Sequence, residues 1–353
     1  MTKRAVTAAI VVGLAVALAF LAAGCGSSSD GAAGTTDTTA ATGTTTATPV
    51  KVGLITDIGQ LNDHGFNELA YNGLKKAERV LGISGRVVES KSAADYVPNM
   101  STLARQGYDL IIGVGFAQGD AIAKAAKKYP DTKFAIVDVD QASLQGKPAN
   151  VRGLLFREQE VGYLAGYLAA LEAKGEGARQ ISAVGGFKEP PVDRYIAGYK
   201  AGADAAVPGT VVRWGYSQDW VDQAKCKELA LNQIQAGSNV VFQVAGGCGL
   251  GALLAAKEQK VWGIGVDADQ SFLGPHVLTS ALKGVDTAVF LTAKAREAGA
   301  FKGGGNAVFG LDQAGVGLGK FSPRANKADI AATKRVAQRI ASGQITGIPT
   351  TLK

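Results

Sequence analysis

From residue 50 onward, short apolar runs alternate with longer segments whose apolar positions recur at helical spacing. Residues 52–55 form the first run, which has the aliphatic, β-branched character of a buried strand. Residues 69–81 follow with apolar side chains at spacings of about three and four, which predicts an amphipathic helix. The chain therefore begins as a βα unit.

The same alternation continues through the rest of the chain. Strands are predicted at residues 85–89, 109–114, 133–137, 151–156, 180–184, 210–215, 239–244 and 261–266. Helices are predicted at residues 97–106, 120–128, 161–171, 192–205, 224–235, 252–259 and 327–342. Alternating strands and helices predict an α/β fold with doubly wound, mostly parallel sheets.

The second half repeats the βα order of the first, which predicts two similar lobes with a ligand in the cleft between them. The globular part has about 300 residues, more than a single core usually supports. We expect an N-terminal lobe of residues 50–155 plus about 281–305. The C-terminal lobe should comprise residues 156–280 plus about 306–353.

Polar residues gather where the first predicted strand ends, at Asp57, Gly59, Asn62 and Asp63, and Phe66 follows them. In open α/β sheets, ligands bind outside the carboxyl ends of the strands. This stretch is therefore a candidate half-site. The alternative is an ordinary polar βα loop with a packed Phe.

The N-terminus has the pattern of an export signal. Lys3 and Arg4 precede an uncharged apolar run, residues 5–23, and small residues lead into Cys25. The pattern resembles a bacterial lipoprotein signal, which implies removal of residues 1–24 and acylation of Cys25. The alternative is an uncleaved helical anchor. Residues 25–49, rich in Ser, Thr, Gly and Ala, are expected to form a flexible tether. Both alternatives place the protein on the extracytoplasmic face of the cell membrane.

The charge of the chain does not indicate a nucleic-acid surface. The formal net charge is +7, and removal of Lys3 and Arg4 with the signal would leave +5. The basic residues are spread along the chain, and few aromatic residues accompany them. We therefore expect no nucleic-acid partner.

Two cysteines remain after Cys25. Cys226 should lie at the start of one helix, and Cys248 follows the next predicted strand, at the same edge of the sheet. An even pair outside the cytoplasm favours a disulfide. Two free buried thiols are the alternative.

The chain offers little for catalysis. Its only histidines are His64 and His276, and no Cys, His and Asp cluster has metal-ligand spacing. The glycines of residues 247–251 approach a dinucleotide fingerprint, but the third comes one residue early. We therefore expect no enzyme, no catalytic residue, no cofactor and no metal ion, with a dinucleotide-dependent oxidoreductase as the enzymatic alternative.

Several motifs in order resemble the basic membrane protein family of substrate-binding lipoproteins, whose type member is a purine nucleoside receptor. They are DIGQLNDHGFN (57–67), YPDTKFAIVD (129–138), VVFQVAGGCG (240–249), GIGVDADQ (263–270) and LTSALKGVD (278–286). The resemblance covers nearly everything from Lys51 onward. It implies a two-lobed periplasmic-binding-protein type I fold with three hinge crossings, together with ABC permease and ATPase partners.

The resemblance also implies a ligand site. Phe66 and Phe242 would stack on a base, because two rings can enclose a flat heterocycle. Asp57 and Asp138 would bind its polar edge, and Asp267 the ribose hydroxyls. The remaining positions are Lys283 near the sugar, Gly247 as a backbone contact, and Asn62 within the first motif.

Two departures from the family pattern bear on the ligand. His64-Gly65 stands where Lys-Ser is more common, and Cys248 where Thr is usual. The interpretation is a monomeric lipoprotein that captures purine nucleosides for an importer. The alternatives are a sugar- or signal-binding protein of the same fold, and a surface adhesin.

Overall fold

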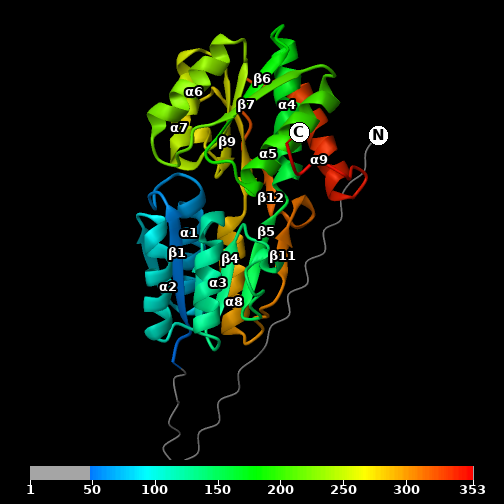
Figure 1. Ribbon diagram of the computed structural model, residues 1–353. Coiled ribbons are helices and arrows are strands. Elements are labelled where there is room, and N and C mark those ends of the chain that lie inside the picture. Colours follow the sequence, from blue (N-terminus) through cyan, green and yellow to red (C-terminus); the bar gives the residue numbers. More distant parts are fainter. Residues whose placement is uncertain (1–47, 353) are drawn as a thin grey trace, which may run out of the picture. The chain divides into compact units, whose positions relative to one another are not determined.

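The computed structural model describes residues 48–352 and shows an α/β protein with two six-stranded sheets (Figure 1). The predicted signal, Cys25 and nearly all of the predicted tether lie outside the described residues.

The first sheet is entirely parallel and has the strand order β11-β5-β4-β3-β1-β2. Its strands are β1 (Lys51–Ile58), β2 (Ser84–Ser90), β3 (Leu110–Gly113), β4 (Lys133–Val137), β5 (Val151–Phe156) and β11 (Asn306–Phe309). The central strands β1, β3 and β4 are mostly buried and apolar, as expected for a parallel sheet covered on both faces, whereas the edge strands β2 and β11 are largely exposed or partly buried.

The second sheet repeats this order as β12-β10-β9-β8-β6-β7, with β12 as an antiparallel edge strand. Its strands are β6 (Gln180–Gly185), β7 (Val211–Tyr216), β8 (Val240–Val244), β9 (Trp262–Asp267), β10 (Val277–Lys283) and β12 (Val316–Leu318). The predicted doubly wound, mostly parallel fold is confirmed.

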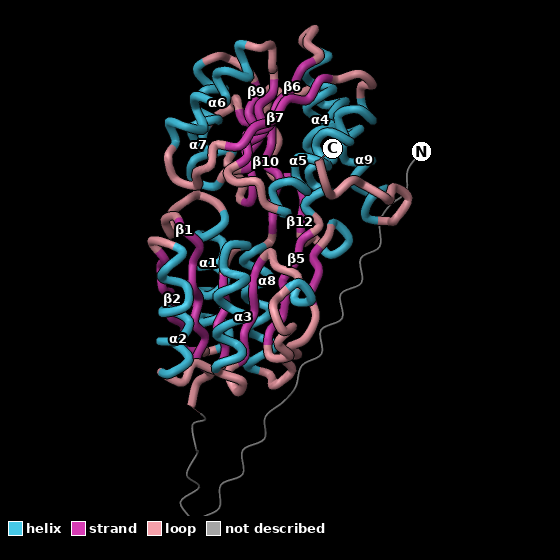
Figure 2. The backbone as a smooth tube through the Cα atoms, viewed as in Figure 1, coloured by secondary structure: helices cyan, strands magenta, loops and turns pink. Residues whose placement is uncertain are grey.

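Helices cover both faces of each sheet (Figure 2). The first sheet is covered by α1 (Phe66–Leu81), α8 (Val285–Glu297), α2 (Tyr96–Arg105) and α3 (Gly119–Lys128). The second is covered by α4 (Glu158–Gly175), α5 (Pro190–Ala206) and α9 (Lys327–Ala341) on one side and by α6 (Gln223–Gln235) and α7 (Gly249–Glu258) on the other. We call the first sheet with its helices the first lobe, and the second sheet with its helices the second lobe.

Four glycines allow α4 and α5 to pack closely. Gly162 and Gly166 on α4 and Gly198 and Gly202 on α5 all face the other helix, and a Cβ at any of them would overlap a backbone carbonyl oxygen there. This spacing of four places each pair on one helix face. The contact fixes α5, whose N-terminus borders the site described below.

The chain passes between the lobes three times. The crossings follow β5 at Arg157, β10 at Gly284, and β11 at residues 310–315. An ion pair joins the first and third crossings, in which one guanidinium nitrogen of Arg157 lies 3.6 Å from Asp312 Oδ1. The Glu160 carboxylate also accepts the amide hydrogen of Leu311, with a donor–acceptor distance of 2.8 Å.

Strand pairing moves two of the expected lobe boundaries. We expected the chain to enter the first lobe at about residue 281, but β10 continues in the second sheet to Lys283. We expected it to leave at about residue 305, but residues 306–309 pair with β5 in the first sheet. The run NAVF is short and only its last residue is buried, so its sequence did not mark it as a strand.

Within residues 48–352, none of the helices combines the length and the apolar character needed to cross a bilayer.

Candidate functional site

A pocket lies between the two lobes and is lined by residues of both. Its position, outside the carboxyl ends of the strands of both sheets, is the usual place for a ligand in α/β proteins. Six of the eight predicted ligand-binding residues line this pocket: Asp57, Phe66, Asp138, Gly247, Asp267 and Lys283. Asn62 and Phe242 do not.

Three buried aspartates reach the pocket from strand ends. Asp57 lies near the end of β1, Asp138 directly follows β4, and Asp267 ends β9. Asp138 and Asp267 have φ angles of 71° and 62°, in the left-handed region that few non-glycine residues adopt. Such strain is typical of residues whose side chains are held in place for a function.

The Asp57 carboxylate is held from two sides. One oxygen accepts hydrogen bonds from the Tyr96 hydroxyl and from the Ile58 amide. The other approaches Gly115, where a Cβ would overlap it. Burial raises the pKa of Asp57 despite these hydrogen bonds.

Among the described residues, Lys283 is the one positively charged residue that lines the pocket. Its Nζ atom is 2.7 Å from Asp138 Oδ2 and 3.0 Å from Glu158 Oε1. Burial alone would lower the pKa of the Lys283 ammonium, but the Asp138, Glu158 and Asp267 carboxylates outweigh burial and raise the pKa. Lys283 therefore stays charged and joins β10 of the second lobe to Asp138 of the first.

The pocket has more acids than Lys283 neutralises. Burial raises the pKa of Asp138 to about 6, against the opposing charge of Lys283. Burial likewise raises the pKa of Asp267 to about 7, and its carboxylate accepts a 3.4 Å hydrogen bond from the Tyr195 hydroxyl. One Asp138 oxygen has no hydrogen-bond partner among the described residues. Such groups accept hydrogen bonds from a polar, uncharged ligand.

Four aromatic residues line the pocket: Phe66 and Phe116 from the first lobe, and Tyr195 and Trp220 from the second. Phe66 lies at the start of α1 and Trp220 in the loop before α6. The Lys283 Nζ atom lies 5.2 Å from the centre of the Phe66 ring. The Trp220 ring packs on Gly186, where a Cβ would overlap it, and lies 5.4 Å from the ring of Phe187.

Phe242, expected to stack on a base, does not line the pocket in this structure. Phe242 is fully buried in β8, where its ring packs 5.9 Å from Tyr195 and 5.1 Å from Tyr199 on α5. Every residue of β8 is buried, so hydrophobicity alone does not show which face of the strand meets a ligand. The strand instead contributes Val244 to the pocket.

Asn62 is exposed in the turn after β1 and does not reach the pocket. Its neighbours Asp63 and Asn67 do. The Asp63 carboxylate accepts the amide hydrogens of Gly65, Asn67 and Glu68 and so caps α1. The Asn67 side chain accepts the amide hydrogen of Asp57. These two residues organise the loop that presents Asp57 and Phe66.

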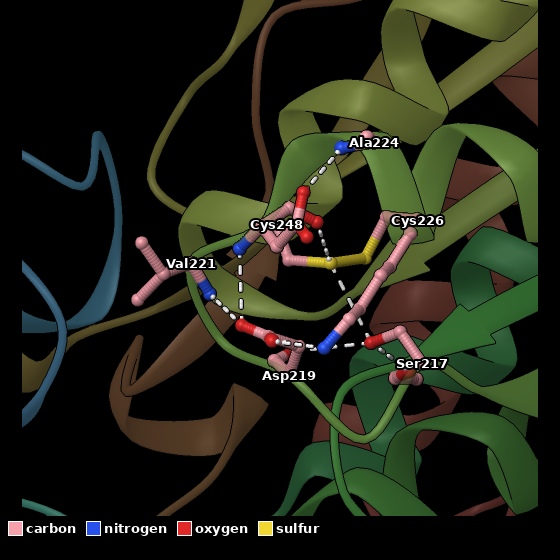
Figure 3. Close-up of polar contacts among 9 residues, drawn as sticks. Ser217, Asp219, Val221, Ala224, Cys226 and Cys248 are labelled. Atoms are coloured by element: carbon pink, nitrogen blue, oxygen red, sulfur yellow. Dashed lines mark hydrogen bonds and ion pairs between the residues drawn. A yellow bond between two sulfur atoms is a disulfide. The ribbon is translucent and has the colours of Figure 1, made fainter.

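A disulfide joins Cys226 in α6 to Cys248, with the two Cα atoms 5.6 Å apart (Figure 3). The pairing is the one we favoured over two free thiols. The Cys248 amide also donates to the Trp220 carbonyl, at 2.9 Å. The bond therefore links the two segments that carry Trp220 and Gly247.

The loop that carries Trp220 is further held by Asp219. Its carboxylate accepts the amide hydrogens of Val221 and Asp222 and lies 2.7 Å from Lys225 Nζ (Figure 3). These contacts, the Lys225 hydrogen bond first among them, lower the pKa of Asp219 to about 2.

The glycines that approach a dinucleotide fingerprint have packing roles. A Cβ at Gly249 would overlap the Gln243 side chain, and a Cβ at Gly251 would overlap the Gln223 carbonyl. They bring α7 close to β8 and α6. Among residues 48–352, no cluster of His, Cys, Asp and Glu has the arrangement of a metal site.

Sequence reasoning missed several pocket residues, among them Phe116, Trp220, Tyr195 and Glu189. Trp220 had a usable signal, because it is an aromatic residue in a polar loop between a strand and a helix, as Phe66 is. Tyr195 reads as a core residue of α5, and Glu189 as a helix cap.

A two-lobed α/β protein whose chain crosses three times between the lobes, with a polar and aromatic pocket between them, is a solute-binding protein of the periplasmic type I class. Comparison with known proteins narrows this class. The chain belongs to the Bmp family, described as "ABC transporter substrate-binding protein PnrA-like", whose sequence profile matches residues 50–349.

Relatives carry names that agree with this family. The chain is 35% identical to "ABC transporter nucleoside-binding protein BmpA" of Lactococcus lactis, over 86% of this chain and 89% of that protein. It is 34% identical to "Basic membrane protein D" of Borreliella burgdorferi, over 76% and 78%. It is 33% identical to "Uncharacterized lipoprotein PH1714" of Pyrococcus horikoshii, over 76% and 68%.

A solved structure has the same fold. The crystal structure of an ABC transporter solute-binding protein from Aeropyrum pernix matches 85% of this chain and 94% of its own, with 28% identity and a TM-score of 0.77. The protein is thus an ABC transporter substrate-binding protein and not an enzyme. Its partners are a small-molecule ligand and the permease and ATPase subunits of a transporter.

Proposed function

We propose that this protein captures purine nucleosides in the pocket between its lobes and delivers them to an ABC importer. The observation that carries the proposal is the combination of Phe66 and Trp220, from opposite lobes, with three buried aspartates in one pocket. A flat base between two rings gains stacking and burial, and the carboxylates accept hydrogen bonds from base and ribose. The name of the Lactococcus lactis relative supports the same ligand class.

Each group has a role in this proposal. Asp57 and Asp138 accept hydrogen bonds from the polar edge of the base, and Asp267 accepts them from ribose hydroxyls. Lys283 keeps Asp138 oriented and lies close to the sugar. Gly247 lines the pocket and presents its backbone to the ligand without a side chain in between.

Calorimetric titration of residues 50–353, unfolded and refolded to remove any ligand carried through purification, tests the proposal. The panel is adenosine, guanosine, inosine, uridine, adenine and ribose. We expect tight one-to-one binding of purine nucleosides, with adenine and ribose each weak. Binding of ribose or another sugar without any nucleoside binding would overturn the nucleoside assignment and leave the fold and transporter class intact.

We also propose that the mature protein is a monomer anchored by acylated Cys25 to the extracytoplasmic face of the membrane. The signal-like pattern of residues 1–24 and the lipoprotein name of the Pyrococcus horikoshii relative support this location. Metabolic labelling with a radioactive fatty acid should mark the wild-type chain and not the Cys25→Ala variant. Equal labelling of both would contradict the anchor.

A further inference from the structure

Glu189 lines the pocket from the second lobe and has no role in the site described so far. It directly precedes α5, with an extended backbone (φ −127°, ψ 153°). A Ser, Thr, Asp or Asn at this position usually accepts an amide hydrogen of the first helical turn. Among the described residues, the Glu189 side chain makes no such capping bond.

Two prolines reduce the number of amide hydrogens that Glu189 could cap. Pro190 and Pro191 are the first two residues of α5 and have no amide hydrogen to donate, which leaves Val192 as the donor in reach of a cap, and Glu189 makes no side-chain bond to it. The Glu189 backbone is nevertheless fixed, because its amide donates to Phe187 and its carbonyl accepts from Asp193. These backbone bonds fix the position of Glu189, and its side chain lines the pocket.

The charges that face Glu189 are mainly acidic. Burial, together with the Asp57 and Asp138 carboxylates of the first lobe and against the Lys283 ammonium, raises the pKa of Glu189 to about 7. Asp63 and Asp267 line the same pocket. Enclosing an uncharged ligand here removes water from these acids without supplying a positive charge, so one acid must take up a proton.

We propose that Glu189 is a further ligand-recognition residue, which carries a proton in the nucleoside complex and donates a hydrogen bond to the base while Asp57 accepts one. This inference rests on the proposed nucleoside function. The polar edge of a purine presents an acceptor beside a donor, O6 beside N1–H in hypoxanthine and guanine, and N1 beside the amino group in adenine. One carboxylic acid and one carboxylate complement such an edge, whereas two carboxylates leave the acceptor unpaired.

The Kd of inosine and of adenosine, measured from pH 5.5 to 8.5, tests this proposal in three proteins. Above pH 7 the wild type should lose up to about tenfold in affinity per pH unit, because one proton is taken up on binding. Glu189→Gln keeps a donor and an acceptor but does not titrate, so its Kd should change little above pH 7. Glu228→Gln removes the same charge from an exposed site on α6 and should behave as the wild type does.

Calorimetry of wild-type protein at pH 7.5, in phosphate and in Tris, gives the number of protons taken up without any variant. We expect close to one proton, and a value near zero would overturn the inference. A wild-type pH slope that persists in Glu189→Gln would also overturn it and would assign the proton to Asp138 or Asp267. If all three proteins fail to bind either nucleoside, both the proposed function and this inference are refuted. If they bind nucleosides but the wild-type Kd does not rise above pH 7, only this inference is refuted.

Discussion

Replacing Asp267 with Asn should stabilise the unliganded protein above pH 7, although it removes a proposed ligand contact. The Asp267 carboxylate is buried and accepts one long hydrogen bond, from Tyr195, within the described structure. An Asn oxygen can accept the same bond. The backbone φ of 62° also suits Asn, which adopts the left-handed region more readily than most residues. The substitution therefore removes a buried charge with little change of geometry.

The pKa of Asp267 gives the magnitude and the sign of this change in unfolding free energy. Burial raises the pKa of Asp267 from 3.8 to about 7 in the folded state. One pKa unit corresponds to about 1.4 kcal/mol, so ionising Asp267 costs the folded protein at most about 4 kcal/mol. A raised folded-state pKa means that this cost is absent below pH 4 and grows as the pH rises to 7. Asp267→Asn should thus exceed the wild type in unfolding free energy by an amount that increases from pH 4 to pH 7 and is constant above it.

Urea unfolding followed by circular dichroism at pH 4.5, 6 and 8 measures this difference. Asp131→Asn, at an exposed position, is the matched control and should leave the unfolding free energy nearly unchanged at each pH. The same Asp267 variant should lose roughly 1.5–3 kcal/mol of nucleoside binding energy, because a charged acceptor is lost. A variant that is less stable than the wild type at pH 8, or a difference that does not depend on pH, would refute the reasoning.

Three further predictions concern the walls of the pocket and the second lobe. Trp220→Ala should weaken nucleoside binding by about 1–3 kcal/mol in calorimetry. Phe242→Ala should instead lower the unfolding free energy by about 3–5 kcal/mol, because it leaves a cavity in the core. The opposite pattern would show that Phe242 contacts the ligand. Replacing Cys226 and Cys248 together with Ala should cost about 3 kcal/mol in urea unfolding, since the bond closes a loop with a sequence separation of 22, and an unchanged midpoint would contradict that estimate. Gly166→Leu should prevent α4 from packing against α5 and sharply lower the melting temperature, and a normal melting temperature would show that the helices can separate at this point.

Much of the fold could be predicted from the sequence because its periodic pattern is strong. Buried parallel strands are continuous aliphatic runs, and the helices between them are long enough to show their period. Strands β10, β11 and β12 were not predicted: β11 and β12 are short and only partly buried, and polar residues interrupt the apolar run of β10. The pairing of β11 with β5 depends on a partner about 150 residues away in sequence, which local patterns do not reveal.

The site residues that lie at the carboxyl ends of strands could be predicted from the sequence. Asp57, Asp138 and Asp267 each lie at or beside the carboxyl end of a strand, so topology alone brings them to the pocket. Phe242 lies inside a strand buried on both faces, where the direction of a side chain depends on the register. Glu189 required knowing that the helix it precedes has no amide hydrogen at its first two positions.

The ion pair of Lys283 with Glu158 has a consequence for how the lobes could move. Glu158 follows the first crossing and Lys283 precedes the second, so the pair ties two crossings together beside Asp138. In a rotation about these crossings, each atom is displaced in proportion to its distance from the axis. Asp138 and Lys283 would then stay almost stationary, while Trp220 and Glu189 travel with their lobe. A ligand would therefore keep nearly constant contacts with Asp138 and Lys283 near the axis. The motion would change mainly its distances to Trp220 and Glu189.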